Sequence, residues 1–254
     1  MENLSQYVKN HRSDWVIPEV NSEITHGDMP GDKVEIGSDH INKARLIFPV
    51  LLDEIEHYNS EKIVISVYGG SGVGKSEIAS LLSHYLREFG ISAYTMSGDN
   101  YPHRIPKHND LERERVYLER GIEGLREYLG SELEINFKEV NQIIRLFKKN
   151  EICIYLRRMG REVGQLWYEP VDFSNIQILM LEWTHGNNQN LHGIDIPVFL
   201  NSTPEETLAH RKARNRDGKV DSPFTTMVLK LEQELLASQL GRAKIRIAKS
   251  GFLE

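Results

Sequence analysis

The sequence predicts an α/β fold built on a doubly wound parallel sheet. One observation is a glycine-rich pattern, Gly69–Ser76, that joins the apolar run Ile63–Tyr68 to a segment of helical periodicity. A second is that further apolar runs of strand length alternate with amphipathic helical segments along the rest of the chain. Strands and helices that alternate in this way build a parallel sheet with right-handed crossovers and helices on both faces.

The glycine-rich pattern is the Walker A sequence G-x-x-x-x-G-K-[ST], which binds the phosphates of a nucleotide. Its glycines let the backbone adopt positive φ angles and bring successive N–H groups to a polyphosphate, at the positive end of the following helix. Lys75 would reach the β- and γ-phosphates, and the Ser76 hydroxyl would hold Mg²⁺. The sequence therefore predicts a P-loop NTPase that uses ATP and Mg²⁺, with a nucleotide site made of Gly69, Gly70, Ser71, Gly72, Val73, Gly74, Lys75 and Ser76.

Length and composition limit the classes of protein that fit. The 254 residues, of which 39% are hydrophobic and 27% charged, suffice for one large domain with an extension. A formal net charge of −6 argues against a nucleic-acid partner. No apolar run approaches the ~20 residues of a membrane span, and no signal-peptide pattern is present. The single cysteine, Cys153, excludes an internal disulfide and a cysteine zinc site, fits a cytoplasmic location, and lies between isoleucines as a core residue would.

The first 40 residues are expected to form an N-terminal extension to a main domain at residues 41–254. Two short apolar stretches, at residues 15–17 and 33–36, predict strands of a small β arm; the alternative is a partly mobile extension. From residue 41 to 58 apolar residues recur at helical spacing, so a helix is expected to lead into the strand before the phosphate loop.

The later elements follow from periodicity and from start and stop signals. Gly90 is placed to end the helix after the phosphate loop, and Thr203 with Glu206 predicts a capping box that begins a later helix. Residues 103–150 are expected to be a helical insert. The predicted core strands are 91–96, 176–182, 194–201 and 244–248, the further helices 103–130, 137–149 and 222–239, and a short strand pair 151–156 and 162–168.

Carboxylates follow two of the predicted strands, at the edge where open α/β sheets bind ligands. Asp99 lies just beyond the strand at 91–96 and is expected to accept a proton from, or orient, an acceptor hydroxyl beside the γ-phosphate. The alternative for Asp99 is a turn residue that caps the local backbone. Glu182 ends the strand at 176–182 and is expected to bind Mg²⁺ or its water; the alternative is a structural carboxylate paired with a lysine.

Three arginines follow the capping box and predict a lid over the phosphates. Arg211, Arg214 and Arg216 lie in a segment, residues 211–221, that would close on the nucleotide and neutralise charge in the transition state. Arg211 and Arg214 share a helical face, whereas Arg216 points away unless the helix ends near it. The alternative is a solvated basic face, which is what most charge runs form.

Together, these features resemble the uridine kinase and phosphoribulokinase family of P-loop small-molecule kinases, over about residues 62–239. The resemblance implies transfer of the γ-phosphate of ATP to a hydroxyl of a small molecule, with Asp99 in the family's acidic motif as catalytic base. Tyr155–Arg158 looks like the family's acceptor-binding segment, although the histidine of that segment is missing. Adenylylsulfate kinases are a more distant likeness, and a nucleotide-dependent regulatory or binding protein is the alternative from another functional class.

Cationic residues gather in two segments where this architecture puts the acceptor. One is residues 103–108, beyond the strand at 91–96, and the other is residues 157–161, ahead of the strand at 176–182. Since the whole chain is acidic, and since arginine matches the geometry of carboxylates and phosphates, an acceptor that carries a negative charge is predicted. The alternative is that these arginines form surface ion pairs. The sequence is also compatible with a homo-oligomer. The predicted acceptor-site residues are Asp99, Tyr101, His103, Arg104, Arg157 and Arg158.

Overall fold

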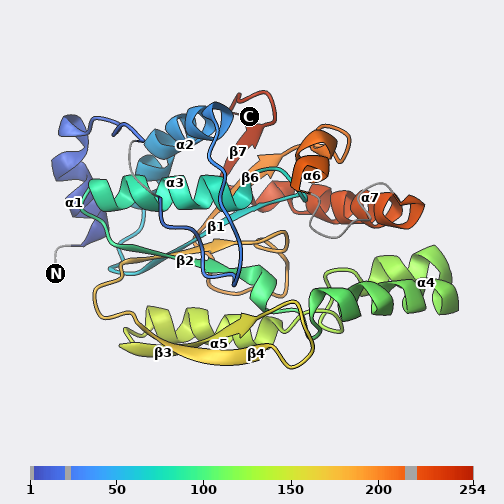
Figure 1. Cartoon of the computed structure of the whole chain (residues 1–254). Helices are drawn as coiled ribbons and strands as arrows, with labels where there is room; N and C mark the ends of the chain where they lie inside the picture. The colour runs from blue at the N-terminus through green and yellow to red at the C-terminus, as the bar shows by residue number, and fades with distance from the viewer. Residues whose placement is uncertain (1–2, 21–23, 215–221, 254) are drawn as a thin grey trace.

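A five-stranded parallel sheet forms the centre of the computed structural model, which describes residues 3–20, 24–214 and 222–253 (Figure 1). Each neighbouring pair in the sheet is parallel, and the strand order is β2-β5-β1-β6-β7. The predicted fold class, an α/β sheet of P-loop type, is confirmed. The strands are β1 (Ile63–Gly69), β2 (Ala93–Ser97), β5 (Ile178–Glu182), β6 (Ile196–Asn201) and β7 (Ile245–Ala248).

Strand β1 lies at the middle of the sheet, and all seven of its residues are buried. Its side chains alternate between two hydrophobic clusters, as the twofold period of a strand requires. Ile63, Ile65 and Val67 belong to the cluster on one face, while Val64 belongs to the cluster on the other. The carboxyl end of β1, where the phosphate loop begins, is therefore fixed by packing on both faces and by a hydrogen-bonded strand on either side.

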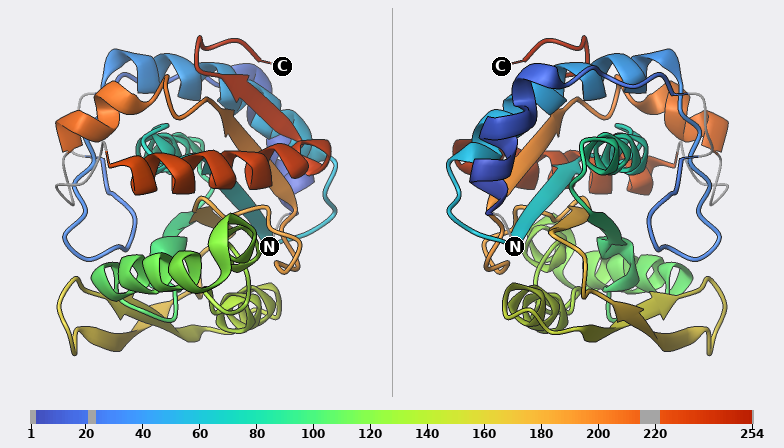
Figure 2. Two further views of the ribbon diagram at one scale, coloured as in Figure 1. Left: turned by 90° about the vertical axis from the view of Figure 1, so that its right-hand side faces the viewer. Right: turned by 90° about the vertical axis from the view of Figure 1, so that its left-hand side faces the viewer.

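Helices cover both faces of the sheet (Figure 2). On one face lie α2 (Ser38–Glu56) and α3 (Lys75–Glu88), with α1 (Leu4–His11) packed against α2. On the other face lie α5 (Phe137–Lys148) and a separate antiparallel hairpin, β3 (Cys153–Met159) with β4 (Leu166–Asp172). The remaining helices are α4 (Pro106–Tyr128), α6 (Leu208–Arg214), α7 (Pro223–Ser238), and the 3-10 turns Arg12–Asp14, Gly98–Asn100 and Leu240–Arg242.

The N-terminal extension differs from its prediction. Within the described residues 3–20 and 24–40, the two stretches expected to be strands are extended but pair with no other strand, and residues 4–11 form helix α1 instead. The apolar residues are used in another way, because Trp15, Ile17 and Ile36 pack directly on the cluster that α2 and α3 form on the sheet. The extension is thus part of the main hydrophobic core.

The predicted strand pair exists, but it is shifted towards the C-terminus. The sequence suggested a turn at residues 157–161, whereas Arg157 and Arg158 lie inside β3 and the turn closes where the Gly160 N–H donates to the Gln165 carbonyl (2.7 Å). Cys153 is exposed, so its prediction as a core residue was wrong. Side chains alternate along β3, and its neighbour Ile154 takes the inward position.

One predicted helix end is confirmed, and one predicted helix start lies too early in the chain. Gly90 has φ +89° and follows the end of α3. The Gly90 N–H donates to the backbone carbonyl of Arg87 at 2.9 Å, and the Ile91 N–H donates to the backbone carbonyl of Leu86 at 2.8 Å. Thr203 and Glu206 exchange side-chain-to-backbone hydrogen bonds of 2.7 and 3.3 Å, as the predicted capping box requires, but a turn at residues 204–207 follows and α6 begins only at Leu208. Across the ranges that the structure covers, no helix combines the length and the apolar character needed to cross a bilayer.

The docking of α1 gives a first prediction. Leu4 is fully buried in the main cluster, so Leu4→Ala should lower the free energy of unfolding by about 2–5 kcal/mol, measured by urea denaturation. The matched control is Leu118→Ala on α4, where the side chain is 83% exposed and the change should stay within about 0.5 kcal/mol. If both variants unfold like the parent protein, α1 contributes nothing to the folded core.

Candidate active site

The phosphate loop occupies the turn between β1 and α3, and its glycines are required by its geometry. Gly72 and Gly74 have φ angles of +76° and +95°, which side chains rarely tolerate. A Cβ atom on Gly72 would lie 2.8 Å from the Cγ of Arg211, and one on Gly74 would lie 2.8 Å from the His40 ring. The loop is therefore enclosed by the lid helix α6 on one side and by the first turn of α2 on the other.

Lys75 and Ser76 begin α3 and face the loop. The Lys75 ammonium donates to the Gly70 carbonyl across a distance of 3.1 Å, so its charge lies over the turn whose amides would hold phosphate. The Ser76 hydroxyl donates to Glu182 Oε2 at 3.3 Å. The predicted nucleotide residues are thus brought together at one end of the sheet, in contact with the carboxylate that the sequence assigned to Mg²⁺.

Glu182 ends β5 between the ends of β1 and β2, and it is 4% exposed. Its second oxygen, Oε1, accepts a hydrogen bond of 2.5 Å from the Ser97 hydroxyl. Burial, and then the negative charge of Asp99, raise the pKa of Glu182 to about 8. A divalent cation would relieve this repulsion, because it would give both carboxylates a positive neighbour.

The donor atoms around Glu182 suit Mg²⁺, which prefers one or two carboxylates together with waters and substrate phosphates. Ser76 and Glu182 supply hard oxygen ligands, and Asp99 lies close enough to act on Glu182 electrostatically. Among the described residues, no group of three or more histidine, cysteine or acidic side chains forms a metal site of its own. A cation held here would therefore need phosphate and water oxygens to complete its coordination.

Asp99 lies in the 3-10 turn Gly98–Asn100 directly after β2. Its side chain is exposed, whereas Gly98 and Asn100 on either side of it are buried. A Cβ on Gly98 would lie 2.0 Å from the Trp183 ring, so the turn can sit against this ring only because Gly98 has no side chain. The buried neighbours fix the turn and leave Asp99 directed out of it, as a residue that meets a substrate must be.

Three residues of the predicted acceptor site make contacts within the protein, and their role at the acceptor stays a prediction. Tyr101 is fully buried and its hydroxyl contacts the sulfur of Met96 at 3.8 Å. His103 contacts the Glu132 carbonyl at 3.0 Å, and Arg104 donates to the Tyr128 hydroxyl at 3.1 Å. These contacts join the segment before α4 to the segment that follows it. Since the partners lie about 25 residues further along the chain, local sequence patterns did not reveal them.

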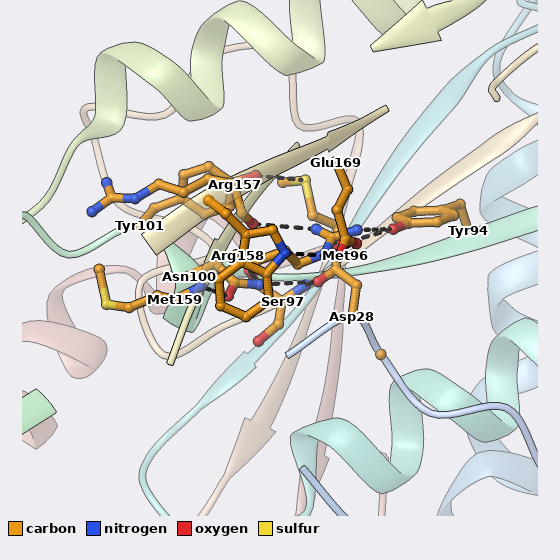
Figure 3. A network of polar contacts seen from close by, with 12 residues as sticks. Asp28, Tyr94, Met96, Ser97, Asn100, Tyr101, Arg157, Arg158, Met159 and Glu169 are labelled. Carbon is orange, nitrogen blue, oxygen red and sulfur yellow. Dashed lines mark hydrogen bonds and ion pairs between the residues drawn. The ribbon is translucent and has the colours of Figure 1, made fainter. Parts of the chain in front are cut away.

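Arg157 and Arg158, which the sequence predicts as ligands of a charged acceptor, have partners within the protein. Arg157 donates to the Pro102 carbonyl at 2.9 Å and lies 3.6 Å from Glu139. Arg158 forms ion pairs with Asp28 (2.8 Å) and Glu169 (3.0 Å) (Figure 3). Both guanidinium groups are nearly buried and are engaged by the protein itself. The negative charge predicted for the acceptor therefore loses its main support.

The predicted lid is described in part. Arg211 lies over Gly72 and donates to the Thr207 hydroxyl. Arg214 is the last residue of α6, and Arg216 lies outside the described residues. A narrow cleft runs between the phosphate loop, the capping-box turn and α7; its lining includes Gly70, Ser71, Thr203, Thr207, Arg211, Glu232 and Gln233.

Sequence reasoning missed an arginine on α4 that pairs with Glu232, one of the residues that line this cleft. Arg113 lies between two carboxylates, Glu134 at 2.6 Å and Glu232 at 3.2 Å. Burial raises the pKa of Glu232, on which the charges of Lys75 and Asp99 also act. The charged run around Arg113 has the pattern of a solvent-exposed helix face, but the sequence held one signal that Arg113 points inward. Asn109 and Val116, four residues before it and three after, are buried and mark the inward side of the helix.

The raised pKa of Glu182 gives a prediction about stability. The folded state retains this proton up to about pH 8, whereas the unfolded carboxyl releases it near 4.5, so stability should fall as pH rises between these values. Glu182→Gln lacks this ionisation. Without divalent cations, the Tm of the variant should exceed that of the parent by an amount that grows from pH 4.5 to 8 and then levels off. Equal Tm curves across this range would mean that Glu182 ionises normally.

Comparisons with known proteins agree with this geometry. A bifunctional alpha-galactosidase/sucrose kinase, AgaSK, from Mediterraneibacter gnavus is 50% identical over 190 residues. The match covers 75% of this chain but 20% of that protein, so the chain spans about a fifth of the relative's length.

Three solved structures share the fold at 14–18% identity. A putative fructose transport system kinase from Silicibacter has a TM-score of 0.57, over 78% of this chain and 94% of that one. A possible uridine kinase from Bacillus stearothermophilus has a TM-score of 0.57, over 81% and 97%. Phosphoribulokinase from Rhodobacter spheroides has a TM-score of 0.56, over 74% and 70%. The predicted resemblance to P-loop small-molecule kinases is confirmed at the level of the fold.

The family itself is shown by sequence. Residues 45–214 match the KAP family P-loop domain, a range that begins in α2, includes the phosphate loop and both strand-end carboxylates, and ends with α6. Since this match covers more than half of the chain, the protein belongs to the KAP family of P-loop domains.

Proposed function

We propose that the protein is an ATP- and Mg²⁺-dependent kinase that transfers the γ-phosphate of ATP to a hydroxyl group of sucrose or a closely related sugar. The observation that carries the reaction class is the convergence of Lys75, Ser76, Glu182 and the exposed Asp99 at one end of the sheet. The sugar is suggested by the relative whose name includes sucrose kinase.

Each residue has a chemical task in this proposal. The loop amides and Lys75 hold the β- and γ-phosphates, and Ser76 with Glu182 would hold the metal. When bound, Mg²⁺ would offset charge that builds up on the phosphate oxygens. Asp99 accepts the proton of the attacking sugar hydroxyl, or orients that hydroxyl towards the γ-phosphorus. The acceptor oxygen bonds to the γ-phosphorus as its proton passes to Asp99 or to water. The bond from the γ-phosphorus to the oxygen that bridges the β- and γ-phosphates breaks, and ADP leaves with its electron pair.

Arg211 on α6 supports the same reaction, because it lies over the phosphate loop at Gly72. In this proposal its charge stabilises the transferring phosphoryl group, which is the task that the sequence assigned to the lid. Arg113 is paired with Glu134 and Glu232, so it is assigned to the support of the cleft and not to the phosphates. The roles of Arg214 and Arg216 stay predictions.

The contacts of Arg157 and Arg158 favour an uncharged acceptor. Because both side chains are engaged with protein oxygens, they offer no ready site for a carboxylate or phosphate on the acceptor. A sugar has no such group and is recognised by hydrogen bonds to its hydroxyls. This reading replaces the anionic acceptor expected from the sequence. A cytoplasmic location and a homo-oligomer stay predictions.

The proposal is tested by phosphoryl transfer from γ-labelled ATP. With Mg²⁺, the protein should label sucrose in preference to glucose, fructose, uridine, ribulose 5-phosphate or adenylylsulfate. Lys75→Ala should abolish transfer to every acceptor, because the variant lacks the charge over the phosphates, while its Tm stays near that of the parent. ATP binding without transfer to any acceptor would favour the alternative, a nucleotide-dependent binding protein, and a charged best acceptor would contradict the sugar assignment.

The role of Asp99 gives a separate prediction. An amide keeps the size of the side chain but cannot take a proton, so Asp99→Asn should lower kcat by about 10²–10⁴-fold. The affinity for ATP, measured by titration without acceptor, should barely change, because Asp99 is assigned to the acceptor. Asp172→Asn, at an exposed carboxylate at the end of β4, is the matched control and should keep the parent kcat. A large loss of ATP affinity with an unchanged kcat would instead place Asp99 on the nucleotide.

A further inference from the structure

A buried carboxylate from the N-terminal extension lies among the residues that surround the proposed base. In Figure 1 the trace between α1 and α2 descends past α3 to the level of β2 and then returns. Asp28 belongs to this segment, and its Oδ1 atom accepts from the backbone N–H of Ser97 at 2.7 Å. The side chain of Asp28 is 7% exposed. The extension therefore places a buried acidic group at the carboxyl end of β2.

Four hydrogen-bond donors converge on this carboxylate (Figure 3). Oδ1 accepts from the Ser97 N–H and from the Asn100 amide at 3.2 Å. Oδ2 accepts from the Tyr94 hydroxyl at 3.0 Å and from Arg158 at 2.8 Å. Two donors thus meet each oxygen, which is the full capacity of a carboxylate whose four lone pairs are used.

Two of these donors stand on either side of Asp99. Ser97 comes two residues before it and Asn100 one residue after it, so Asp28 fixes both ends of the turn that presents the base. The Ser97 hydroxyl, in turn, donates to Glu182 at 2.5 Å. The side-chain Oδ1 of Asn100 accepts from the backbone N–H of Met159 at 2.9 Å, which joins the same turn to strand β3.

We propose that Asp28 is a positioning residue for phosphoryl transfer: it holds the Gly98–Asn100 turn so that Asp99 and Glu182 keep one fixed separation. This inference rests on the proposed function, in which Asp99 serves the acceptor and Glu182 the metal. Asp28 contacts no reacting atom and acts through Ser97 and Asn100. A displacement of about 1 Å in a catalytic group can cost about 10²-fold in rate, so the turn needs such support.

A simpler role for Asp28 would be to neutralise the buried charge of Arg158. The two roles separate because they depend on different partners of the same carboxylate. Charge balance requires Arg158, which approaches Oδ2, whereas positioning requires the Ser97 N–H and the Asn100 amide, which approach Oδ1. Removal of the whole ion pair restores charge balance but leaves those two donors without their acceptor.

The experiment therefore compares Arg158→Met with the double variant Asp28→Leu, Arg158→Met. The single variant leaves Asp28 as an uncompensated buried charge, so its Tm should fall while its kcat stays close to that of the parent. In the double variant no unpaired buried charge remains, because the other partner of Arg158, Glu169, is half exposed, so the Tm should recover. The kcat should nevertheless fall by about 10- to 100-fold with an unchanged KM for ATP. Asp14→Asn, an exposed aspartate of the same extension, is the control and should match the parent in both respects.

Hydrogen exchange gives a second measurement that needs no acceptor. Amides of residues 97–101 should exchange faster in the double variant than in the single one, whereas those of the phosphate loop, residues 69–76, should not change. Recovery of kcat together with Tm, or unchanged exchange at residues 97–101, would overturn the inference and leave Asp28 as a charge partner of Arg158. If the parent protein transfers phosphate to no acceptor, the proposed function fails, and the exchange comparison still decides whether Asp28 holds the turn.

Discussion

The burial of one carboxylate where three strands end is the constraint on which the rest of the site depends. Glu182 lies beside the ends of β1 and β2, with hydroxyls from Ser76 and Ser97 on its two oxygens. Those hydroxyls come from the phosphate loop helix and from the strand before Asp99. The Glu182 carboxylate thereby connects the nucleotide side of the site to the acceptor side. Its burial there disfavours its own ionisation.

A carboxylate held in this way is unfavourable for stability and useful for metal binding. Water would stabilise the charge of Glu182, but the sheet excludes it, and Asp99 adds repulsion. A cation bound there would replace the missing solvation. The same burial that destabilises the protein with Glu182 ionised would therefore strengthen the affinity of Glu182 for the cation. Active sites commonly combine local instability with function in this way.

The surroundings of the site are held by pairs of opposite charge brought from distant parts of the chain. Arg113 joins α4 to α7 through Glu232, and Arg158 joins the β3–β4 hairpin to the N-terminal extension through Asp28. Removing one partner of such a buried pair costs more than removing both, because a lone charge remains without water. The extension is therefore a component of the site's support, although it lies outside the residues that match the family.

The sequence by itself determined the sheet, the phosphate loop and the two strand-end carboxylates, because these depend on short-range patterns. Apolar runs, glycines and caps act within a few residues of one another, and the parallel direction of the strands follows from the alternation of strands and helices. Only the tertiary structure decided what each arginine contacts. Arg158 and Asp28 are 130 residues apart, and Arg113 and Glu232 are 119 apart. Such pairs form when separate elements pack, and no local pattern distinguishes an arginine that awaits an anionic substrate from one that is paired inside the fold.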